Sequence, residues 1–363
     1  MAGWVTVSTD DAVPIGPLTE WLHANVAGSH GAVHVEQLSG GSSNLTFRVR
    51  DDVHDLVLRR PPLGRVLATA NDVLREHRVQ HALAATDVPV AAMLGACADV
   101  SVIGAPFYVM SMLDGVVYTD AEAVAHLTEA DARAASYELV DVLVRLHAVD
   151  PSAVGLADLG RPDGFLERQV RRWRTQWETS KQHDCPEIEE VADRLSRAVP
   201  AGAHTGIVHG DYSFNNTIWE RHRPAVMQAV LDWEMATLGD PLTDLGMLVT
   251  YWGPVGERLW RARAPQPHRA NAGFPSADAL VERYARASSR PLDDIDFYRV
   301  LATFKLAVIS EGALARIVER APERAASTRA VVEELAAAAL DQAERSSDPA
   351  LNGRARAKEA YQR

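Results

Sequence analysis

The chain has 363 residues, 47% hydrophobic and 24% charged, an ordinary composition for a globular protein with room for two lobes. Its net charge of −12 argues against nucleic acid as a partner, because binding phosphate backbones requires a basic surface. No apolar run approaches the length of a membrane span and no secretion signal is visible, so we expect no membrane association and a cytoplasmic location. Cys97 and Cys185 lack metal-ligand spacing, which indicates isolated thiols in a reducing compartment.

Lysine is nearly absent from the sequence. Lys181, Lys305 and Lys358 are the three lysines among 37 basic residues, which leaves 34 arginines. Together with abundant alanine, this bias favours a bacterial protein from a GC-rich genome. Because no lysine precedes residue 181, any cation that the N-terminal part offers to a nucleotide must be arginine or histidine.

The N-terminal part is expected to form a small antiparallel sheet with a packed helix. Helical spacing of apolar residues predicts helices over 15–26 and 70–85. Alternating or short apolar runs predict five strands, over 33–38, 44–50, 55–60, 91–97 and 106–112. We therefore predict an N-terminal nucleotide-binding lobe over residues 1–112, with one helix inserted after the third strand.

From residue 122 onward the sequence becomes mostly helical. Apolar residues recur at helical spacing in seven segments: 134–147, 165–180, 187–198, 242–251, 276–287, 295–318 and 325–345. Two short strands, TIW and VMQAVL, interrupt them. We predict a helical catalytic and substrate-binding lobe over 113–346, a loop over 262–275 and a polar tail over 347–363. The fold class is therefore α+β with two lobes.

The segment that contains these two short strands and the loops on either side of them gives the strongest indication of function. Residues 207–234 read IVHGDYSFNNTIWERHRPAVMQAVLDWE, with Asp211 followed five residues later by Asn216 and then by Asp232 after an apolar run. A carboxylate that accepts a hydroxyl proton, followed by an amide and a carboxylate that hold Mg²⁺, is the equipment of a kinase catalytic loop. His-Gly-Asp alone occurs by chance, but this combination in one register favours catalysis.

Several N-terminal residues fit a nucleotide site. Gly41, Ser42 and Ser43 lie in a glycine turn between two predicted strands, which suits either a phosphate-covering loop or a plain hairpin. Arg59 ends a strand and Glu76 lies in the next helix, a pairing typical of kinases, although either Arg59 or Arg60 could face the nucleotide. The alternative is that Arg59 is a surface arginine and that Glu76 lies on a solvated helix face.

Other polar residues near these motifs have a structural interpretation. The apolar segment 107–115 breaks at its terminal glycine, and Ser111 and Leu113 would lie at a hinge where backbone groups contact adenine. Asp240, in a Gly-Asp-Pro turn that starts a helix, and Asp244 are interpreted as structural. His147 and His209 are interpreted in the same way. No nucleophile elbow is present, so hydrolysis is not favoured.

The phrases GGSSN, LVLRRPP, REHRV, FYVMSMLDG, HGDYSFNN and LDWEMATLGDPLTDL resemble the aminoglycoside phosphotransferase and choline kinase-like family over roughly residues 30–315. VLRRPP and LDWE-x4-GDP are similar to a bacterial branch, and to the kinase-like domain fused to acyl-CoA dehydrogenases in animals, which is associated with phosphorylating hydroxyacyl-CoA. The resemblance implies a bilobal kinase-like fold, ATP (or GTP), Mg²⁺ and a small-molecule hydroxyl acceptor. The chain departs from most kinases in having arginine where they have lysine.

Carried over by motif, the resemblance makes Asp211 the catalytic base and Asn216 and Asp232 the metal ligands. It places Gly41, Ser42 and Ser43 over the phosphates, and makes Arg59 the cation that Glu76 steadies. Five residues are candidates for lining the substrate pocket: Tyr251, Trp252, Tyr298, Lys305 and Glu311. Arg171, Arg172 and Arg174 are candidates for contacting a CoA thioester.

Three functions compete at this point. The first is a small-molecule O-kinase, acting either on an aminoglycoside or on hydroxyacyl-CoA or another metabolic alcohol. The second is a non-catalytic nucleotide- or metabolite-binding module, favoured by Arg59 and disfavoured by the intact pair of metal ligands. The third is a protein kinase, which is disfavoured because the HRD, DFG and APE elements are missing. The chain would be a monomer or a homodimer.

Overall fold

The computed structural model describes the chain in five stretches: residues 12–38, 44–63, 72–201, 204–260 and 266–354. The chain separates into two compact units. Unit 1 comprises Met1–Gly115 and Gln228–Ala236, and unit 2 comprises Val116–Met227 and Thr237–Arg363. Segment 228–236, which contains Asp232, thus belongs to the same unit as the N-terminal sheet.

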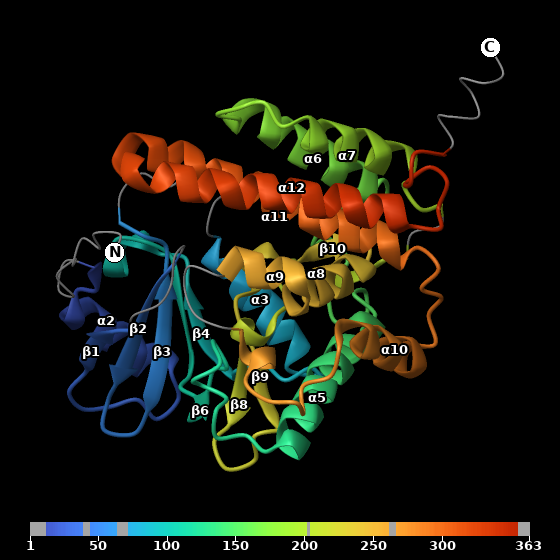
Figure 1. Cartoon of the computed structure of the whole chain (residues 1–363). Coiled ribbons are helices and arrows are strands. Elements are labelled where there is room, and N and C mark those ends of the chain that lie inside the picture. The colour runs from blue at the N-terminus through green and yellow to red at the C-terminus, as the bar shows by residue number, and fades with distance from the viewer. Residues whose placement is uncertain (1–11, 39–43, 64–71, 202–203, 261–265, 355–363) are drawn as a thin grey trace. The chain divides into compact units, whose positions relative to one another are not determined.

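Unit 1 is built on a five-stranded antiparallel sheet in the order β1-β2-β3-β5-β4 (Figure 1). Its strands are β1 (His34–Gln37), β2 (Leu45–Arg50), β3 (Asp55–Arg60), β4 (Met93–Cys97) and β5 (Phe107–Ser111). Helix α3 (Val73–Leu83) follows the third strand. The five predicted strands, the inserted helix and the α+β fold class are therefore confirmed.

The two faces of this sheet pack against different helices because side chains alternate along each strand. Helix α2 (Ile15–Asn25) contributes Leu18 and Leu22 to one core cluster, together with Leu56 and Leu58 of β3. Val57, which lies between those two leucines, joins a second cluster with residues of α3 and β5. The short helix α4 (Val100–Ile103) adds Ile103 to the first cluster.

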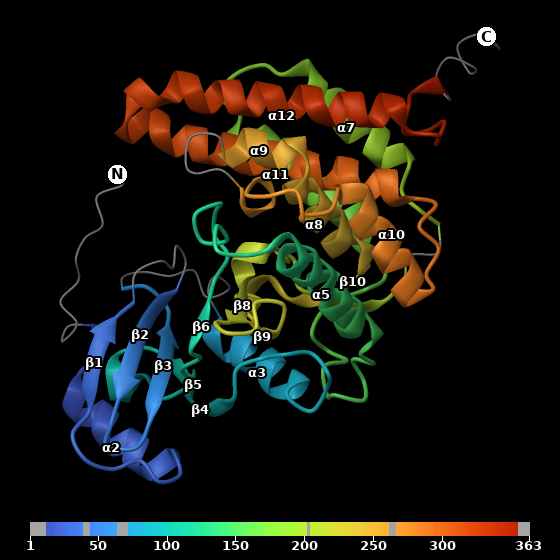
Figure 2. The same ribbon diagram turned by 60° about the horizontal axis from the view of Figure 1, so that its bottom comes forward.

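Unit 2 is mainly helical (Figure 2). Its α-helices are α5 (Glu129–Ala148), α6 (Phe165–Ser180), α7 (Pro186–Arg197), α8 (Leu242–Trp252), α9 (Pro254–Trp260), α10 (Ala277–Ser288), α11 (Ile295–Arg320) and α12 (Ala325–Arg345). A capping box formed by Thr128 and Asp131 starts α5. Helices α11 and α12 lie side by side along their length, and α8 packs against α11.

Short strands frame the segment that carries Asp211. Strand β7 (Gly206–Val208) pairs antiparallel with β10 (Thr237–Gly239). The strands β6 (Gly115–Val116), β8 (Thr217–Glu220) and β9 (Met227–Val230) form a second small sheet in the order β6-β8-β9. The loop with Asp211 and Asn216 thus leaves β7 and enters β8, while Asp232 follows β9.

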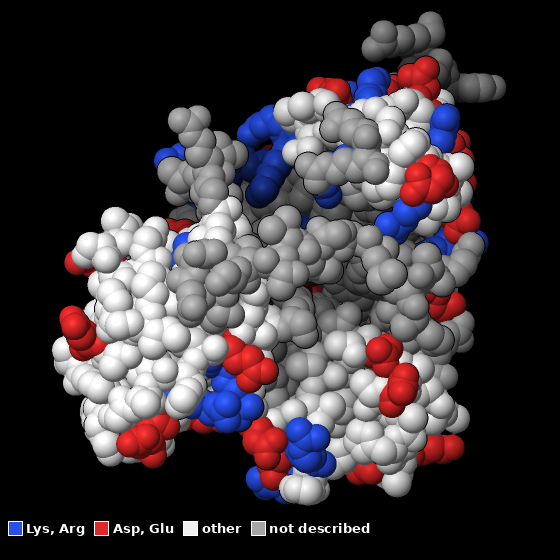
Figure 3. All heavy atoms as spheres, turned by 90° about the vertical axis from the view of Figure 1, so that its left-hand side faces the viewer, with Lys and Arg blue, Asp and Glu red and all other residues white. Residues whose placement is uncertain are grey.

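No helix among the described residues combines the length and the apolar character that crossing a bilayer requires. On the face shown in Figure 3, acidic and basic side chains are interspersed. The ion pair of Arg48 and Asp55, with an N–O distance of 2.6 Å, is one of the surface pairs in unit 1.

Candidate active site

The loop 209–216 is shaped by its glycine and by a short 3-10 turn. Gly210 has φ +89°, a left-handed conformation that side chains disfavour, so glycine is required immediately before Asp211. The backbone N–H of Asp211 then donates to His209 Nδ1 at 3.2 Å. The turn Phe214–Asn216 brings Asn216 back toward Asp211 before β8 begins. Local backbone geometry therefore places the two residues together.

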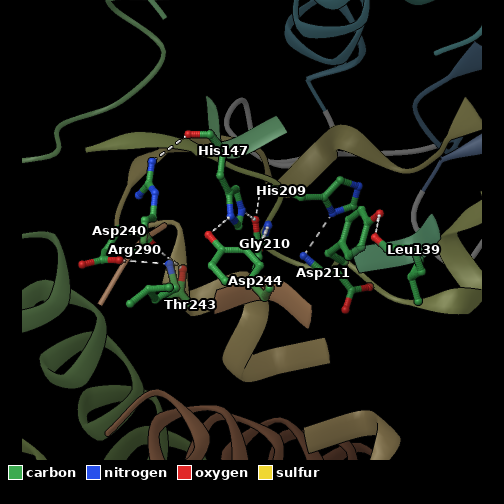
Figure 4. Close-up of polar contacts among 12 residues, drawn as sticks. Leu139, His147, His209, Gly210, Asp211, Asp240, Thr243, Asp244 and Arg290 are labelled. Carbon is green, nitrogen blue, oxygen red and sulfur yellow. Dashed lines mark hydrogen bonds and ion pairs between the residues drawn. The ribbon is translucent and has the colours of Figure 1, made fainter. Parts of the chain in front are cut away.

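Asp244 of α8 fixes the backbone of this loop by hydrogen bonds. Its carboxylate accepts the backbone N–H of His209 at 2.6 Å and that of Gly210 at 2.8 Å. His147 Nε2 lies 3.4 Å from the same carboxylate, and His147 Nδ1 lies 2.8 Å from the hydroxyl of Tyr284 (Figure 4). Because a carboxylate only accepts, Nε2 carries the proton and Nδ1 accepts from the tyrosine.

The charges in this network are set by burial and hydrogen bonding. Burial works to raise the pKa of Asp244, but the hydrogen bond from His147 and those from the loop hold it below its ordinary value. Burial lowers the pKa of His147, although Asp244 opposes this shift. The network therefore consists of an ionised Asp244 and a neutral His147 at neutral pH.

Both carboxylate oxygens of Asp211 are engaged by neighbouring side chains. Asn216 Nδ2 donates to Oδ2 at 3.0 Å and to the Asp211 carbonyl oxygen at 2.8 Å. The hydroxyl of Tyr251, at the end of α8, donates to Oδ1 at 3.2 Å. Burial raises the pKa of Asp211, while the charge of Lys305 and the two hydrogen bonds act to lower it.

Lys305 of α11 supports the loop from another side. Its Nζ donates to the carbonyl oxygen of Gly210 at 2.9 Å and lies 5.7 Å from the ring centre of Trp173. Burial lowers the pKa of Lys305, and the negative charge of Asp211 opposes that shift. A lysine supplies a compact cation where an arginine fork would need more room.

An aromatic cluster fixes the middle of the loop. Phe214 lies edge-on to Trp252, with ring centres 5.5 Å apart, and 6.2 Å from Phe274. The indole N–H of Trp252 donates to the carbonyl oxygen of Pro275 at 2.8 Å. Such edge-to-face packing is favourable beyond the area it buries, so Phe214 anchors the turn that carries Asn216.

In unit 1, Arg59 connects two carboxylates. Its Nη1 lies 3.4 Å from Glu76 Oε1, and its Nη2 lies 3.2 Å from Asp232 Oδ1. Glu76 is 1% exposed, whereas Asp232 is 37% exposed. Burial raises the pKa of Glu76 to about 7, and Arg59 opposes the shift. Burial also works to lower the pKa of Arg59, but Glu76 and Asp232 raise it above its ordinary value.

Strand alternation decides which arginine joins these carboxylates. Arg59 shares its face of β3 with Val57 and points toward α3. Arg60 points to the other face, where it is buried and donates to the carbonyl oxygens of Ala12 and Ile103. Arg59 is therefore the arginine that joins Glu76 and Asp232, whereas Arg60 has a structural role. Contact of Arg59 with a nucleotide stays a prediction.

Asp232 has a left-handed backbone conformation. Its φ of 62° and ψ of 60° are left-handed, which is uncommon outside glycine and tolerated by aspartate. The turn Trp233–Met235 follows at once and contacts α3. Strained conformations of this kind persist where the surrounding packing fixes them, often at ligand sites.

Asn216, in unit 2, and Asp232, in unit 1, each carry a side-chain oxygen of the chemical type that magnesium prefers. Asn216 uses its amide nitrogen for Asp211, which leaves the amide oxygen for a cation. Within the described residues, no cluster of three or more His, Cys, Asp or Glu could hold a metal ion by itself. Magnesium typically takes one or two protein oxygens together with substrate phosphates. Magnesium binding by Asn216 and Asp232 stays a prediction.

The other predicted residues have varied environments. Of the five candidates for the substrate pocket, Tyr251 and Lys305 contact the catalytic loop. Trp252 is buried in the aromatic cluster, Tyr298 donates to Asp240 at 2.9 Å, and buried Glu311 accepts the backbone N–H of Gln182. Trp252, Tyr298 and Glu311 therefore contact other protein groups in the interior of unit 2.

At the hinge, the Ser111 hydroxyl accepts the Ala92 N–H at 3.2 Å, and Leu113 packs on the second core cluster. Gly41, Ser42 and Ser43 lie outside the described residues. Adenine and phosphate contacts at these five positions remain predictions.

Two side-chain contacts within unit 2 were not predicted from the sequence. His183 lies 3.4 Å from Glu311, with its side chain 4% exposed, in the loop between α6 and α7. Arg290 donates to the His147 carbonyl oxygen at 2.8 Å. No local pattern marks either contact, because each joins segments more than a hundred residues apart.

The fold and the loop geometry together define a kinase-like phosphotransferase. Residues 34–280, more than half of the chain, match the profile of the phosphotransferase enzyme family. The chain therefore belongs to this family, as the motifs predicted.

Solved structures of similar proteins agree with this assignment. A candidate aminoglycoside phosphotransferase from Ralstonia eutropha JMP134 is 32% identical, with a TM-score of 0.76 over 89% of this chain and 97% of that one. An aminoglycoside phosphotransferase solved with GDP and kanamycin shares the fold, with a TM-score of 0.61 at 16% identity over 88% and 98% of the two chains.

Curated relatives include a second group of proteins. Acyl-CoA dehydrogenase family member 11 of Gallus gallus is 35% identical over 79% of this chain and 37% of its own length. Acyl-CoA dehydrogenase family member 10 of Mus musculus is 33% identical over 84% of this chain and 28% of its own. The chain thus spans about a third of these relatives, consistent with the predicted resemblance to their kinase-like domain.

Proposed function

We propose that the protein transfers the γ-phosphoryl group of ATP to a hydroxyl group of a small molecule. The observation that carries this proposal is the geometry of Asp211, a half-buried carboxylate fixed by Asn216 at 3.0 Å and by its loop. In the proposed step, the acceptor oxygen forms a bond to the γ-phosphorus, the bond from phosphorus to the bridging oxygen breaks, and the nucleoside diphosphate leaves with that electron pair. The acceptor proton passes to Asp211.

The chain's own residues supply position and charge in this reaction. Asp211 orients the acceptor hydroxyl, and Lys305 keeps the Gly210 carbonyl and a positive charge beside it. Arg59 is the proposed phosphate-binding cation, steadied by Glu76. Mg²⁺, when bound, neutralises charge across the transferred phosphate, and Asn216 and Asp232 would hold it. The GDP complex of one relative leaves GTP as an alternative donor.

The charge near Asp211 favours an anionic acceptor over a polycationic one. Lys305 and exposed Arg172 lie 5.7 and 5.4 Å from the ring of Trp173, so two cations line this side of unit 2. An aminoglycoside would need carboxylates there for its ammonium groups. Hydroxyacyl-CoA or another acidic metabolic alcohol is therefore the acceptor class that we favour, in agreement with the acyl-CoA dehydrogenase names of the curated relatives.

Of the arginines considered for a CoA thioester, Arg174 is already paired. It lies 2.8 Å from Asp193 and 3.4 Å from Glu178. Arg171 and Arg172 are exposed on α6, which leaves them as the proposed contacts.

The test measures release of nucleoside diphosphate from Mg-ATP with two acceptor sets, hydroxyacyl-CoA esters and aminoglycosides. We expect turnover with the CoA esters and little with the aminoglycosides, and loss of turnover in Asp211→Asn. Turnover with aminoglycosides alone would assign the antibiotic class instead. Nucleotide binding that is independent of Mg²⁺, without turnover of any alcohol, would favour the non-catalytic binding module.

A further inference from the structure

The Tyr251 hydroxyl contacts the carboxylate of Asp211, the proposed catalytic base. Asn216 Nδ2 donates to Oδ2 of the carboxylate, and we assign the acceptor proton to the other oxygen, Oδ1. The phenol of Tyr251 already donates to Oδ1 at 3.2 Å. A hydroxyl that donates to the base is the arrangement that general-base catalysis requires of the acceptor itself.

The backbone around Tyr251 holds the phenol in that position. Its neighbour Trp252 is anchored to Pro275 and to Phe214. Helix α8 ends at Gly253, and the Tyr251 carbonyl lies so close to Gly256 that a Cβ at this glycine would collide with it. This close approach fixes the last turn of α8 against the first turn of α9.

The phenol is a stable donor. Burial raises the pKa of Tyr251 well above its ordinary value, and the negative charge of Asp211 raises it further. The hydroxyl therefore keeps its proton at neutral pH and remains hydrogen-bonded to the carboxylate.

We propose that the Tyr251 hydroxyl is a placeholder for the acceptor hydroxyl, and that it suppresses hydrolysis of the nucleotide by water when no acceptor is bound. This inference rests on the proposed function. In the suppressed reaction, water oxygen bonds to the γ-phosphorus, the bridging P–O bond breaks with its electron pair leaving on the nucleoside diphosphate, and the water proton passes to Oδ1 of Asp211. Water has no remote contacts with which to displace the phenol, whereas an acceptor binds through the rest of its molecule.

The test compares acceptor-free hydrolysis of Mg-ATP by wild type and Tyr251→Phe, followed as release of inorganic phosphate. We expect hydrolysis to rise about tenfold, the rate equivalent of about 1.4 kcal/mol or one ordinary hydrogen bond. Tyr118→Phe is the matched control, because it removes a buried hydroxyl that donates to the Pro224 carbonyl oxygen at 3.2 Å. Its hydrolysis rate should equal that of wild type.

The double variant Asp211→Asn/Tyr251→Phe shows whether the gain passes through Asp211. We expect it to abolish the increase. A Tyr251→Phe rate at or below wild type, in a protein that unfolds at the wild-type temperature, would overturn the placeholder role. Phosphate on Tyr251 itself, detected by mass spectrometry, would also overturn it, because the phenol would then be an acceptor.

The same measurements distinguish a failure of the placeholder role from a failure of the proposed function. If wild type transfers phosphate to an alcohol and Asp211→Asn does not, the proposed function stands whatever Tyr251→Phe does. If wild type shows no nucleotide turnover that Asp211→Asn removes, the proposed function and the placeholder role both fail.

Discussion

The ammonium group of Lys305 lies 2.9 Å from the carbonyl oxygen of Gly210, the residue immediately before Asp211. Lysine is rare in this chain, with three against 34 arginines among 37 basic residues, and this one lies half-buried against the loop that carries Asp211. The contact fixes a glycine in a left-handed conformation and places a positive charge beside the proposed base. Lys305 therefore connects α11 to the chemistry of the loop.

Replacing Lys305 by Met should lower kcat by about one to two orders of magnitude, part of the 10²–10⁴ that a general base contributes. Loss of the cation raises the pKa of Asp211, so the acidic limb of the pH–rate profile should move to higher pH. Lys305→Arg should recover part of the rate because it keeps the charge. Lys181→Met, an exposed lysine at the end of α6, is the control, and an unmoved acidic limb in Lys305→Met would contradict the account.

Replacing Arg59 by Met should destabilise unit 1 by about 3–5 kcal/mol at pH 8, because Glu76 is left buried without its counter-charge. The folded-state pKa of Glu76 is already raised to about 7 and would rise further. A carboxyl with a raised folded pKa loses stability as pH rises, so the variant should be less unstable at pH 6 than at pH 8. Urea unfolding of Arg59→Met, Glu76→Gln and the double variant Arg59→Met/Glu76→Gln at pH 6 and pH 8 measures these stability losses. Equal losses for Arg59→Met at both pH values would contradict the prediction.

His147 should make the protein less stable as pH falls. Burial lowers its folded-state pKa, so below the unfolded pKa of about 6.5 the unfolded chain takes up a proton that the folded chain refuses. The free energy of unfolding should therefore decrease from pH 7 to pH 5, by up to about 1.4 kcal/mol per pH unit from this residue. Asp244, with a lowered pKa, adds to the loss only at more acidic pH.

His147→Gln should be less stable than wild type at pH 7 but show a flatter dependence on pH. Urea midpoints at pH 5, 6 and 7 check this. The exposed His23, near the end of α2, provides the control variant His23→Gln, whose slope should match wild type. Parallel slopes for wild type and His147→Gln would contradict the assignment.

Much of the architecture follows from local sequence patterns. Alternation in β3 predicted that Arg59 and Arg60 lie on opposite faces of the sheet, and Arg59 is the one on the α3 face. The helix predicted over 325–345 has those bounds as α12. Strands β7 and β10, three residues each, are too short for any alternation to appear, so they were not predicted.

The contacts around Asp211 could be predicted from the sequence only in part. Asn216 is five residues away, and its contact follows from loop spacing. Tyr251 is 40 residues away and Lys305 is 94, so tertiary packing alone brings them to the loop. Both were named as pocket residues, but their contacts with Asp211 and Gly210 depend on how α8 and α11 pack.

The most direct test of the account is single-turnover transfer from radiolabelled Mg-ATP to an acceptor, measured for wild type and Asp211→Asn. The substitution keeps the shape of the side chain and removes its capacity as a base. We expect the rate of transfer to fall by about 10² or more, while the nucleotide affinity measured by calorimetry is retained. Full-rate transfer by Asp211→Asn would contradict the central claim that Asp211 receives the acceptor proton.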